Sequence, residues 1–160
     1  KLQTGSVKLA ATAFAKKMEL TGDFNAAQSE MVLEFDLDKT DADRFGVELS
    51  NSKGELFRVG FDKKTNQYFS DRTKAGKHDF SQKFAVKEHL APRLDEGSKV
   101  KLHLFFDAAS VELFADNGAT VMTDVFFPNE DFSSAKLFSE NGNTSLAKGM
   151  IYSLEGIWEK

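Results

Sequence analysis

The sequence contains no cysteine, and this absence excludes three kinds of chemistry. The chain can form no disulfide, offers no thiol nucleophile and binds no metal through cysteine ligands. Such a composition is usual in the cytoplasm, but many bacterial secreted proteins also lack cysteine. The cysteine count therefore leaves the cellular compartment open.

Three further features are missing. The formal net charge is −4 without a cluster of lysine and arginine, which argues against nucleic acid or an anionic membrane as a partner. No apolar run reaches the roughly 18 residues that a membrane-spanning helix requires. The chain begins with neither methionine nor a signal peptide, and residues 1–13 are predicted to be a linker or a leading segment of a longer chain.

Phenylalanine is abundant: sixteen Phe stand against one Trp and two Tyr. This imbalance favours a thick aromatic core over a sugar-stacking surface, because Trp and Tyr offer a polar edge as well as a ring face. The length of 160 residues suits a single domain, expected to span residues 1–160.

Apolar and polar residues alternate along most of the chain, which indicates β-strands. The alternation is clear in residues 31–37, 44–72 and 99–106, and turn-forming residues separate the runs. Residues 7–20 are ambiguous, since their alanines tolerate a helix, but alternation from about Lys16 favours a strand. The pattern predicts an all-β fold, an antiparallel two-sheet β-sandwich of the jelly-roll or lectin-like kind.

Residues 104–114 are predicted to form a β-hairpin with its tip at 108–109. One face of this hairpin is apolar, and a slip of one residue would move carboxylates into the core, so the register is well specified. The solvent-facing side carries Phe105, Asp107, Ser110, Glu112 and Phe114. A second hairpin is expected around Gly118, with a three-residue loop that places Val121 and Val125 on the face of Leu113.

Asp107 and Glu112 share the solvent-facing side, and paired carboxylates are the catalytic groups of glycoside hydrolysis. A general acid, however, needs burial to raise its pKa, and an outward strand face provides little. The residues alone favour a solvated or domain-contacting face, with catalysis as the weaker alternative.

Residues 102–128, LHLFFDAASVELFADNGATVMTDVFFP, resemble the signature of the C-terminal β-sandwich module of glycoside hydrolase family 32, the invertase, inulinase and levanase family. Residues 67–76, QYFSDRTKAG, resemble that family's Y-V-D-R-T-x-S-G stretch, and the similarity covers about residues 14–160. The chain departs from the pattern at Ala108, where the family carries an arginine.

The resemblance implies two antiparallel sheets of about six strands each, packed in the whole enzyme against a five-bladed catalytic propeller. The propeller's motifs, W-M-N-D-P-N-G, R-D-P and E-C, do not occur in this sequence. The resemblance therefore implies that this chain contains no catalytic residue, Asp107 and Glu112 included, and no cofactor is expected. A secreted, periplasmic or cell-surface bacterial location is the corresponding expectation.

Other polar groups have two interpretations each. Tyr68, Asp71 and Arg72 either contact sugar hydroxyls or contribute a strand-end ion pair that holds the next loop. The acidic residues of 36–46 lack the spacing of a calcium-binding loop, and the three histidines lack that of zinc ligands. No metal site is predicted.

The sequence thus predicts a non-catalytic module that supports and docks a catalytic propeller of the same polypeptide, in an enzyme acting on levan, inulin or sucrose. The alternative is a carbohydrate-binding module that holds fructan oligosaccharides, and a third reading is a free-standing lectin-like sandwich unrelated to fructans. The candidate contact residues are Tyr68, Asp71, Arg72, Phe105, Asp107, Glu112 and Phe114.

Overall fold

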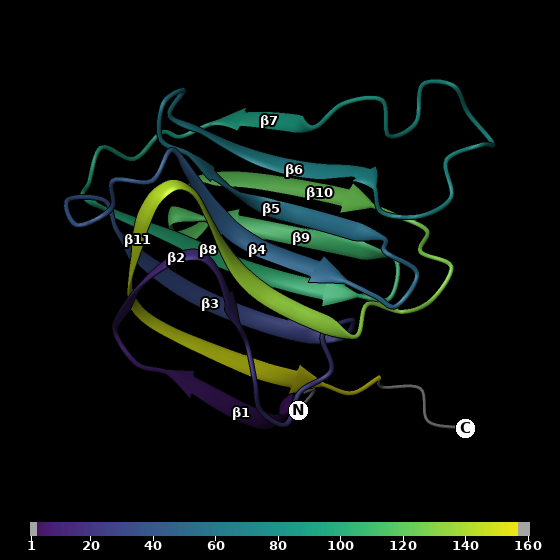
Figure 1. The fold of residues 1–160 in the computed structure, drawn as a ribbon, viewed down its shortest axis with the longest axis horizontal. Coiled ribbons are helices and arrows are strands. Elements are labelled where there is room, and N and C mark those ends of the chain that lie inside the picture. Colours follow the sequence, from purple (N-terminus) through teal and green to yellow (C-terminus); the bar gives the residue numbers. More distant parts are fainter. Residues whose placement is uncertain (1–2, 157–160) are drawn as a thin grey trace.

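Residues 3–156 are described by a computed structural model, and almost all of their regular structure is β-strand (Figure 1). No helix in this part of the chain is long and apolar enough to cross a membrane. The elements in chain order are β1 Gln3–Leu9, β2 Thr12–Glu19, β3 Ser29–Asp36, β4 Arg44–Ser50, β5 Leu56–Asp62, β6 Gln67–Lys74, β7 His89–Pro92, β8 Lys99–Asp107, β9 Ser110–Ala115, the 3-10 turn η1 Asp116–Gly118, β10 Thr120–Val125 and β11 Ser134–Leu154.

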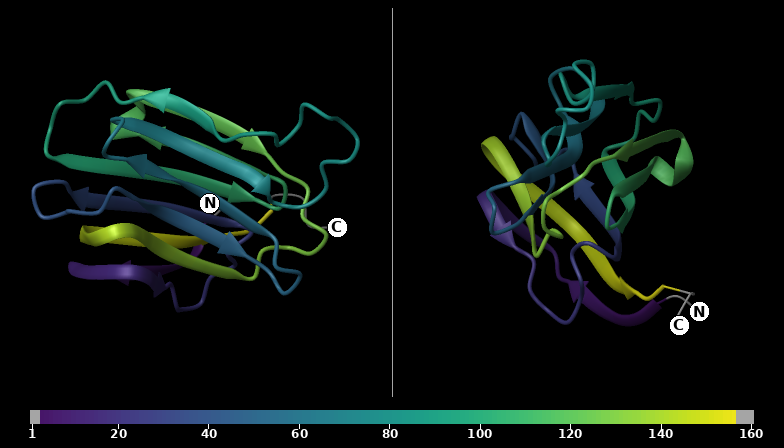
Figure 2. Two further views of the ribbon diagram at one scale, coloured as in Figure 1. Left: turned by 45° about the horizontal axis from the view of Figure 1, so that its top comes forward. Right: turned by 90° about the vertical axis from the view of Figure 1, so that its right-hand side faces the viewer.

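The strands form two layers that pack face to face (Figure 2). Hydrogen bonds connect them in the order β10-β9-β8-β3-β11-β4-β5-β6-β7, and β1 and β2 also pair with β11. Every pairing is antiparallel, as the alternation predicted. The all-β sandwich is therefore confirmed.

The long strand β11 belongs to both layers. Residues 134–140 pair with β4, whereas residues 146–153 pair with β3. Between these segments Asn141 and Gly142 have φ values of 56° and 153°, a conformation that lets the strand bend from one layer into the other. The resemblance implied two separate six-stranded sheets, but the hydrogen bonds make one eleven-stranded sheet folded onto itself, because β11 serves both layers.

The core lies between the layers and consists of the inward residues of each alternating strand. In β3, for example, Met31, Leu33 and Phe35 are all 0% exposed. Rings from the two layers meet there, with the centroids of Phe57 and Phe106 6.3 Å apart. Each fully buried side chain of this size stabilises the fold by roughly 1.5–3 kcal/mol, so the phenylalanine-rich composition is used mainly inside.

The predicted register of the β8–β9 hairpin is confirmed. Phe105 pairs with Glu112 and Asp107 pairs with Ser110, around the tip at 108–109. Leu104, on the opposite face, is fully buried. The predicted and observed registers agree because side chains alternate between the two faces of a strand, so that a slip of one residue would exchange the buried and exposed faces.

The predicted register of the β9–β10 hairpin is wrong. Ala115 pairs with Thr120, so the connection is four residues long, 116–119, and three of these have positive φ. The additional loop residue moves β10 by one position. Val121 and Val125 therefore face solvent, where they are 52% and 41% exposed, instead of joining the core.

The ambiguous N-terminal segment is extended, and the helical alternative is wrong. β2 begins at Thr12 rather than near Lys16, and residues 3–9 form the edge strand β1 on β11. Residues 1–2 of the predicted leading segment lie outside the described residues. Lys16 has a φ of 60°, and the pairing of β2 with β11 shifts register there, which lets β2 follow the bend of β11.

Strands β4 and β5 approach each other closely at a pair of glycines. Gly46 and Gly60 are cross-strand partners, and a Cβ on Gly60 would lie 2.1 Å from the carbonyl oxygen of Phe45. Phe138 and Phe69 flank this pair on the neighbouring strands, yet their ring centroids are only 6.1 Å apart. The two rings therefore lie over the glycines on the outer face of this layer.

We expect Gly60→Ala to lower the free energy of unfolding by about 1–3 kcal/mol, because the new methyl group forces β4 and β5 apart. Urea denaturation of the purified chain measures the change. Gly5→Ala is the matched control, since the nearest atom to its Cβ is the carbonyl oxygen of Asp23 at 3.7 Å. Equal unfolding midpoints for the two variants would contradict the close approach.

Candidate functional site

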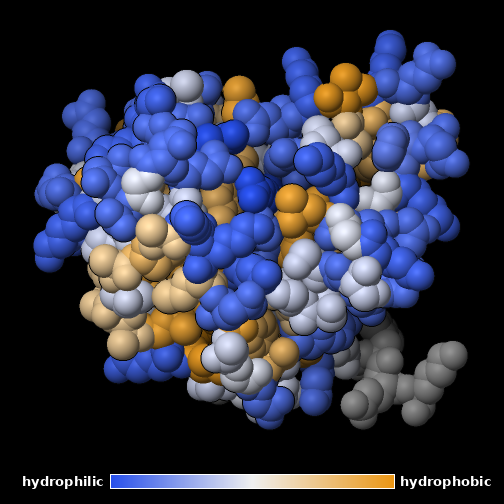
Figure 3. Space-filling view, in the orientation of Figure 1, coloured by the Kyte–Doolittle hydropathy of each residue, from blue (hydrophilic) through white to orange (hydrophobic). Residues whose placement is uncertain are grey.

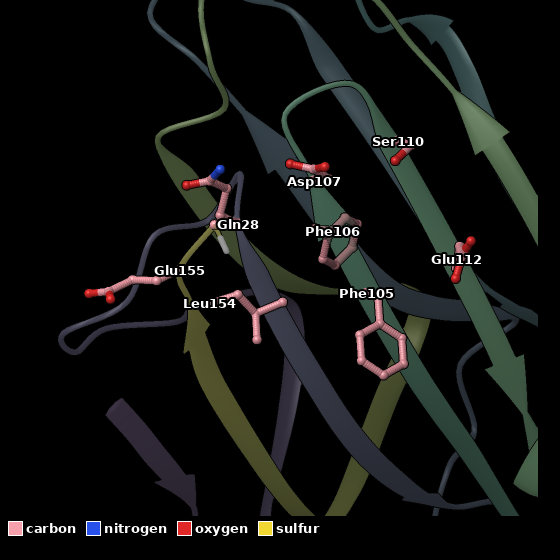
Figure 4. Close-up of a pocket in the computed structure, with 9 residues that line it drawn as sticks. Gln28, Phe105, Phe106, Asp107, Ser110, Glu112, Leu154 and Glu155 are labelled. Carbon is pink, nitrogen blue, oxygen red and sulfur yellow. The ribbon is translucent and has the colours of Figure 1, made fainter. Parts of the chain in front are cut away.

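The outer side of the β8–β9 hairpin and the end of β11 enclose an open pocket of about 320 Å³ (Figure 4). It brings together Phe105, Asp107 and Glu112, three of the candidate contact residues. In Figure 4 the Glu155 carboxylate points away from the other side chains. The full lining is Gln28, Phe105, Phe106, Asp107, Ser110, Glu112, Leu154, Glu155 and Gly156.

The three carboxylates of this pocket, Asp107, Glu112 and Glu155, are exposed to solvent. Asp107 Oδ1 accepts a hydrogen bond from the backbone N–H of Ala108 at 2.8 Å, which helps to close the hairpin. Neither Asp107 nor Glu112 has the buried surroundings that a general acid needs. Their arrangement is suited to accepting hydrogen bonds from hydroxyl groups rather than to transferring a proton.

Phe105 and Phe114 lie next to each other on the outer face, partly covered. Their ring planes are nearly perpendicular, with centroids 6.0 Å apart. His103 packs against Phe105 with a centroid distance of 4.6 Å, and its Nε2 lies 2.7 Å from Glu30 Oε1. The outer face thus presents a short aromatic strip whose neighbours are polar.

Tyr68 lies in the core and reaches no ligand or domain at the surface, because it is 0% exposed. Its hydroxyl donates a hydrogen bond to the carboxylate of Asp116. Burial raises the pKa of Tyr68, and the hydrogen bond to Asp116 raises it further, so the hydroxyl remains a donor. The candidate contact role for this residue is corrected to a structural one.

Asp116 is a buried carboxylate that sequence reasoning missed. Besides the Tyr68 hydroxyl, Arg93 Nε and the backbone N–H of Lys101 donate to it, each at 3.0 Å. Tyr68 belongs to β6 and Lys101 to β8, so the carboxylate joins the two layers. The sequence shows these residues only as turn and strand positions, and no local pattern links them.

Asp124 of β10 makes a second connection between the layers. Its buried carboxylate accepts a hydrogen bond from Ser70 Oγ at 2.7 Å and pairs with Arg72 at 2.9 Å. The expected strand-end ion pair therefore joins Arg72 to Asp124. Asp71 instead accepts a hydrogen bond from the backbone N–H of Thr73 at 2.9 Å and shapes the end of β6.

The acidic segment 36–46 is held by lysines. Lys99 pairs with Asp36 at 2.5 Å, and this hydrogen bond holds the pKa of Asp36 below its usual value. Lys64 pairs with Asp43 at 2.8 Å and lowers the pKa of that carboxyl in the same way. Within residues 3–156, no group of three or more His, Asp or Glu side chains is arranged to hold a metal ion.

Comparison with known proteins provides the family. The profile of the family described as Glycosyl hydrolases family 32 C terminal matches residues 1–153. The chain belongs to this family. It is 30% identical to the levanase of Bacillus subtilis (strain 168) over 81% of this chain and 19% of the levanase. It is 35% identical to the extracellular exo-inulinase of Aspergillus awamori over 75% of this chain and 23% of the inulinase.

A solved structure agrees with the family 32 assignment. The crystal structure of exo-inulinase from Aspergillus awamori matches with a TM-score of 0.82 at 28% identity, over 98% of this chain and 30% of that chain. The resemblance found in the motifs is thereby confirmed. The chain spans about a fifth of the length of the two curated relatives.

We expect Asp116→Asn to destabilise this family 32 module by roughly 3–5 kcal/mol, because the substitution removes the charge that balances the buried guanidinium of Arg93. Urea denaturation monitored by far-UV circular dichroism measures the loss. Asp107→Asn, at an exposed carboxylate, serves as the control and should change stability little. If both variants unfold at the same urea concentration, Asp116 does not hold the layers together.

Proposed function

We propose that this chain is the non-catalytic C-terminal β-sandwich of a fructan-degrading glycoside hydrolase, and that it supports and docks the five-bladed catalytic propeller of the same polypeptide. One observation carries the proposal: the chain matches the C-terminal family over nearly its whole length yet covers only about a fifth of its relatives. The names of these relatives favour levan or inulin as the substrate of the whole enzyme, and sucrose stays a prediction from the motif resemblance.

The geometry of the pocket supports a non-catalytic role. The carboxylates that share it, Asp107 and Glu112, are solvated. The buried carboxylates are paired with cations: Asp116 with Arg93, Asp124 with Arg72, Glu48 with Arg58 and Asp36 with Lys99. A carboxylate held ionised by such a cation has no proton to donate to a substrate.

The isolated chain is expected to release no fructose from levan, inulin or sucrose, because the buried carboxylates of residues 3–156 are ion-paired within the fold and the carboxylates of the pocket are exposed. Reducing-sugar assays over a buffer blank check this, with the polypeptide that includes the catalytic domain as the positive control. Fructose release by the isolated chain that is abolished by Asp107→Asn or Glu112→Gln would overturn the proposal.

A carbohydrate-binding module is the second candidate, and the Figure 4 pocket is the observation that favours it. The ring of Phe105 provides an apolar face, and Asp107 and Glu112 provide hydrogen-bond acceptors beside it. This combination suits the alternating apolar and hydroxyl surfaces of a sugar.

This candidate predicts saturable heat when levan-type or inulin-type oligosaccharides are titrated into the chain, with sucrose as the control ligand. Phe105→Ala should then weaken binding at least about tenfold, because the stacking face is lost. Val121→Ala, an exposed position on the same outer face, is the matched control and should bind normally. The absence of heat at millimolar sugar would exclude the second candidate and leave the docking role.

A further inference from the structure

The loop between β6 and β7, residues 75–88, carries an exposed aromatic cluster at one end of the sandwich. Phe80 and Phe84 belong to this loop, and Phe127 follows β10; the three ring centroids lie 4.8, 5.5 and 5.6 Å from one another. Phe80 is 60% exposed and Phe127 is 40% exposed. Contiguous exposed apolar groups of this kind mark a contact surface.

The cluster is attached firmly to the sandwich. The guanidinium of Arg72, fixed by its ion pair, lies 3.9 Å above the ring of Phe84. The backbone N–H of Lys77 donates to the carbonyl oxygen of Phe127 at 2.8 Å. Gly76 lies so close to the same carbonyl that a Cβ would be 2.1 Å from its oxygen. Because the two loops are bonded to each other, the rings form a preorganised surface, which lowers the entropy cost of docking.

The β8–β9 hairpin tip extends this surface. Residues 108–109 line a pocket of about 550 Å³ together with Phe80, Phe127 and Pro128. We refer to the three rings and the tip, residues 107–110, as the end surface.

The end surface lies beside the start of the described chain. Asp107 and Ser110 line the Figure 4 pocket together with Leu154, and Leu154 pairs with Gln3. In Figure 1 the β6–β7 loop lies at the upper right and the end of β11 lies near the lower edge of the view. A domain that precedes Gln3 therefore starts beside the Figure 4 pocket, which shares Asp107 and Ser110 with the end surface.

The outer face of the β4–β5 layer is covered by its own side chains. Phe69 and Phe138 are buried there, with the guanidinium groups of Arg44 and Arg58 over their rings at 3.8 and 4.7 Å. Figure 3 also shows apolar atoms near β2. The exposed alanines of this segment, Ala11 and Ala13, carry only methyl groups, which offer little contact area. The end surface presents the most exposed aromatic rings of the described chain.

We propose that the catalytic domain of the polypeptide packs on the end surface. This inference rests on the proposed function, since it names the contact through which the module supports its partner. The occupant follows from the family and the attachment point: the matched part of the Bacillus subtilis levanase is 19% of that protein, and the family is described as C-terminal. A catalytic domain attached at Gln3 reaches the end surface through the hairpin tip, because Asp107 and Ser110 line the same pocket as Leu154, the strand partner of Gln3.

The charges beside the rings are of both signs. Exposed Lys77 and Asp131 line the same pocket as Phe80 and Phe127, and exposed Asp79 precedes Phe80 in the loop. The facing patch of the catalytic domain is therefore an apolar centre with a polar rim of mixed charge.

Hydrogen–deuterium exchange of the isolated chain and of the polypeptide that includes the catalytic domain tests the proposal. Peptides covering 75–88 and 126–129 should exchange roughly tenfold more slowly in the longer polypeptide, because docking suppresses local opening. Protection confined to residues outside 75–88, 107–110 and 126–129 would overturn the end surface while leaving the proposed docking function intact. No protection anywhere in the module would overturn the docking function itself.

A double variant, Phe80→Ser with Phe127→Ser, separates docking from folding. In the isolated chain it should lower the unfolding temperature only slightly, because Phe80 is 60% exposed and Phe127 is 40% exposed. In the longer polypeptide it should remove the exchange protection, whereas the control Val121→Ser should retain it. Retained protection in the double variant would contradict the proposal. A second result would also contradict the proposal: the isolated chain forms a dimer that the double variant dissociates, and the longer polypeptide shows no protection. The end surface would then bind a second copy of the chain.

Discussion

Both layers of this sandwich depend on strand β11, because its backbone hydrogen bonds are divided between them. The first part of the strand continues the ladder of β4, and the last part continues the ladder of β3. The bend at residues 141–142 makes this division sterically accessible. One side of the sandwich is therefore held by continuous backbone, which fixes the spacing that the core rings of the two layers then fill.

The side away from β11 is joined by side chains instead of backbone. Asp116 and Asp124 each accept hydrogen bonds from an arginine and from a neutral donor of the opposite layer. Charge-assisted hydrogen bonds of this kind are directional, so they set the position of the connecting loops as well as the layers. Through Arg72 the Asp124 pair also determines where the ring of Phe84 lies.

The functional meaning of the module lies in its surfaces. Its buried carboxylates are engaged in the fold, and Asp107 and Glu112 are solvated, so the pocket carboxylates are suited to accepting hydrogen bonds rather than to transferring a proton. Two exposed regions differ in character: the Figure 4 pocket combines phenylalanine side chains with carboxylates, whereas the end surface is aromatic with a rim of mixed charge. The first suits polyhydroxylated ligands, and the second suits a protein surface.

Much of the fold was predictable because burial on one face imposes a period of two, and the β8–β9 pairing followed from it. The β9–β10 pairing did not follow, since loops of three and four residues fit the same turn signals and differ by one position. The role of Tyr68 was predicted wrongly and Asp116 was missed, because the partners of both residues lie far away in the sequence. Phe80, Phe84 and Phe127 were not found at all, since loop residues carry no periodic signal.

The amino-acid sequence alone determined the strands, the family and the inward faces, which are local properties. Only the tertiary structure decided which polar groups join the layers and which rings meet at the surface, because those contacts depend on segments that folding brings together.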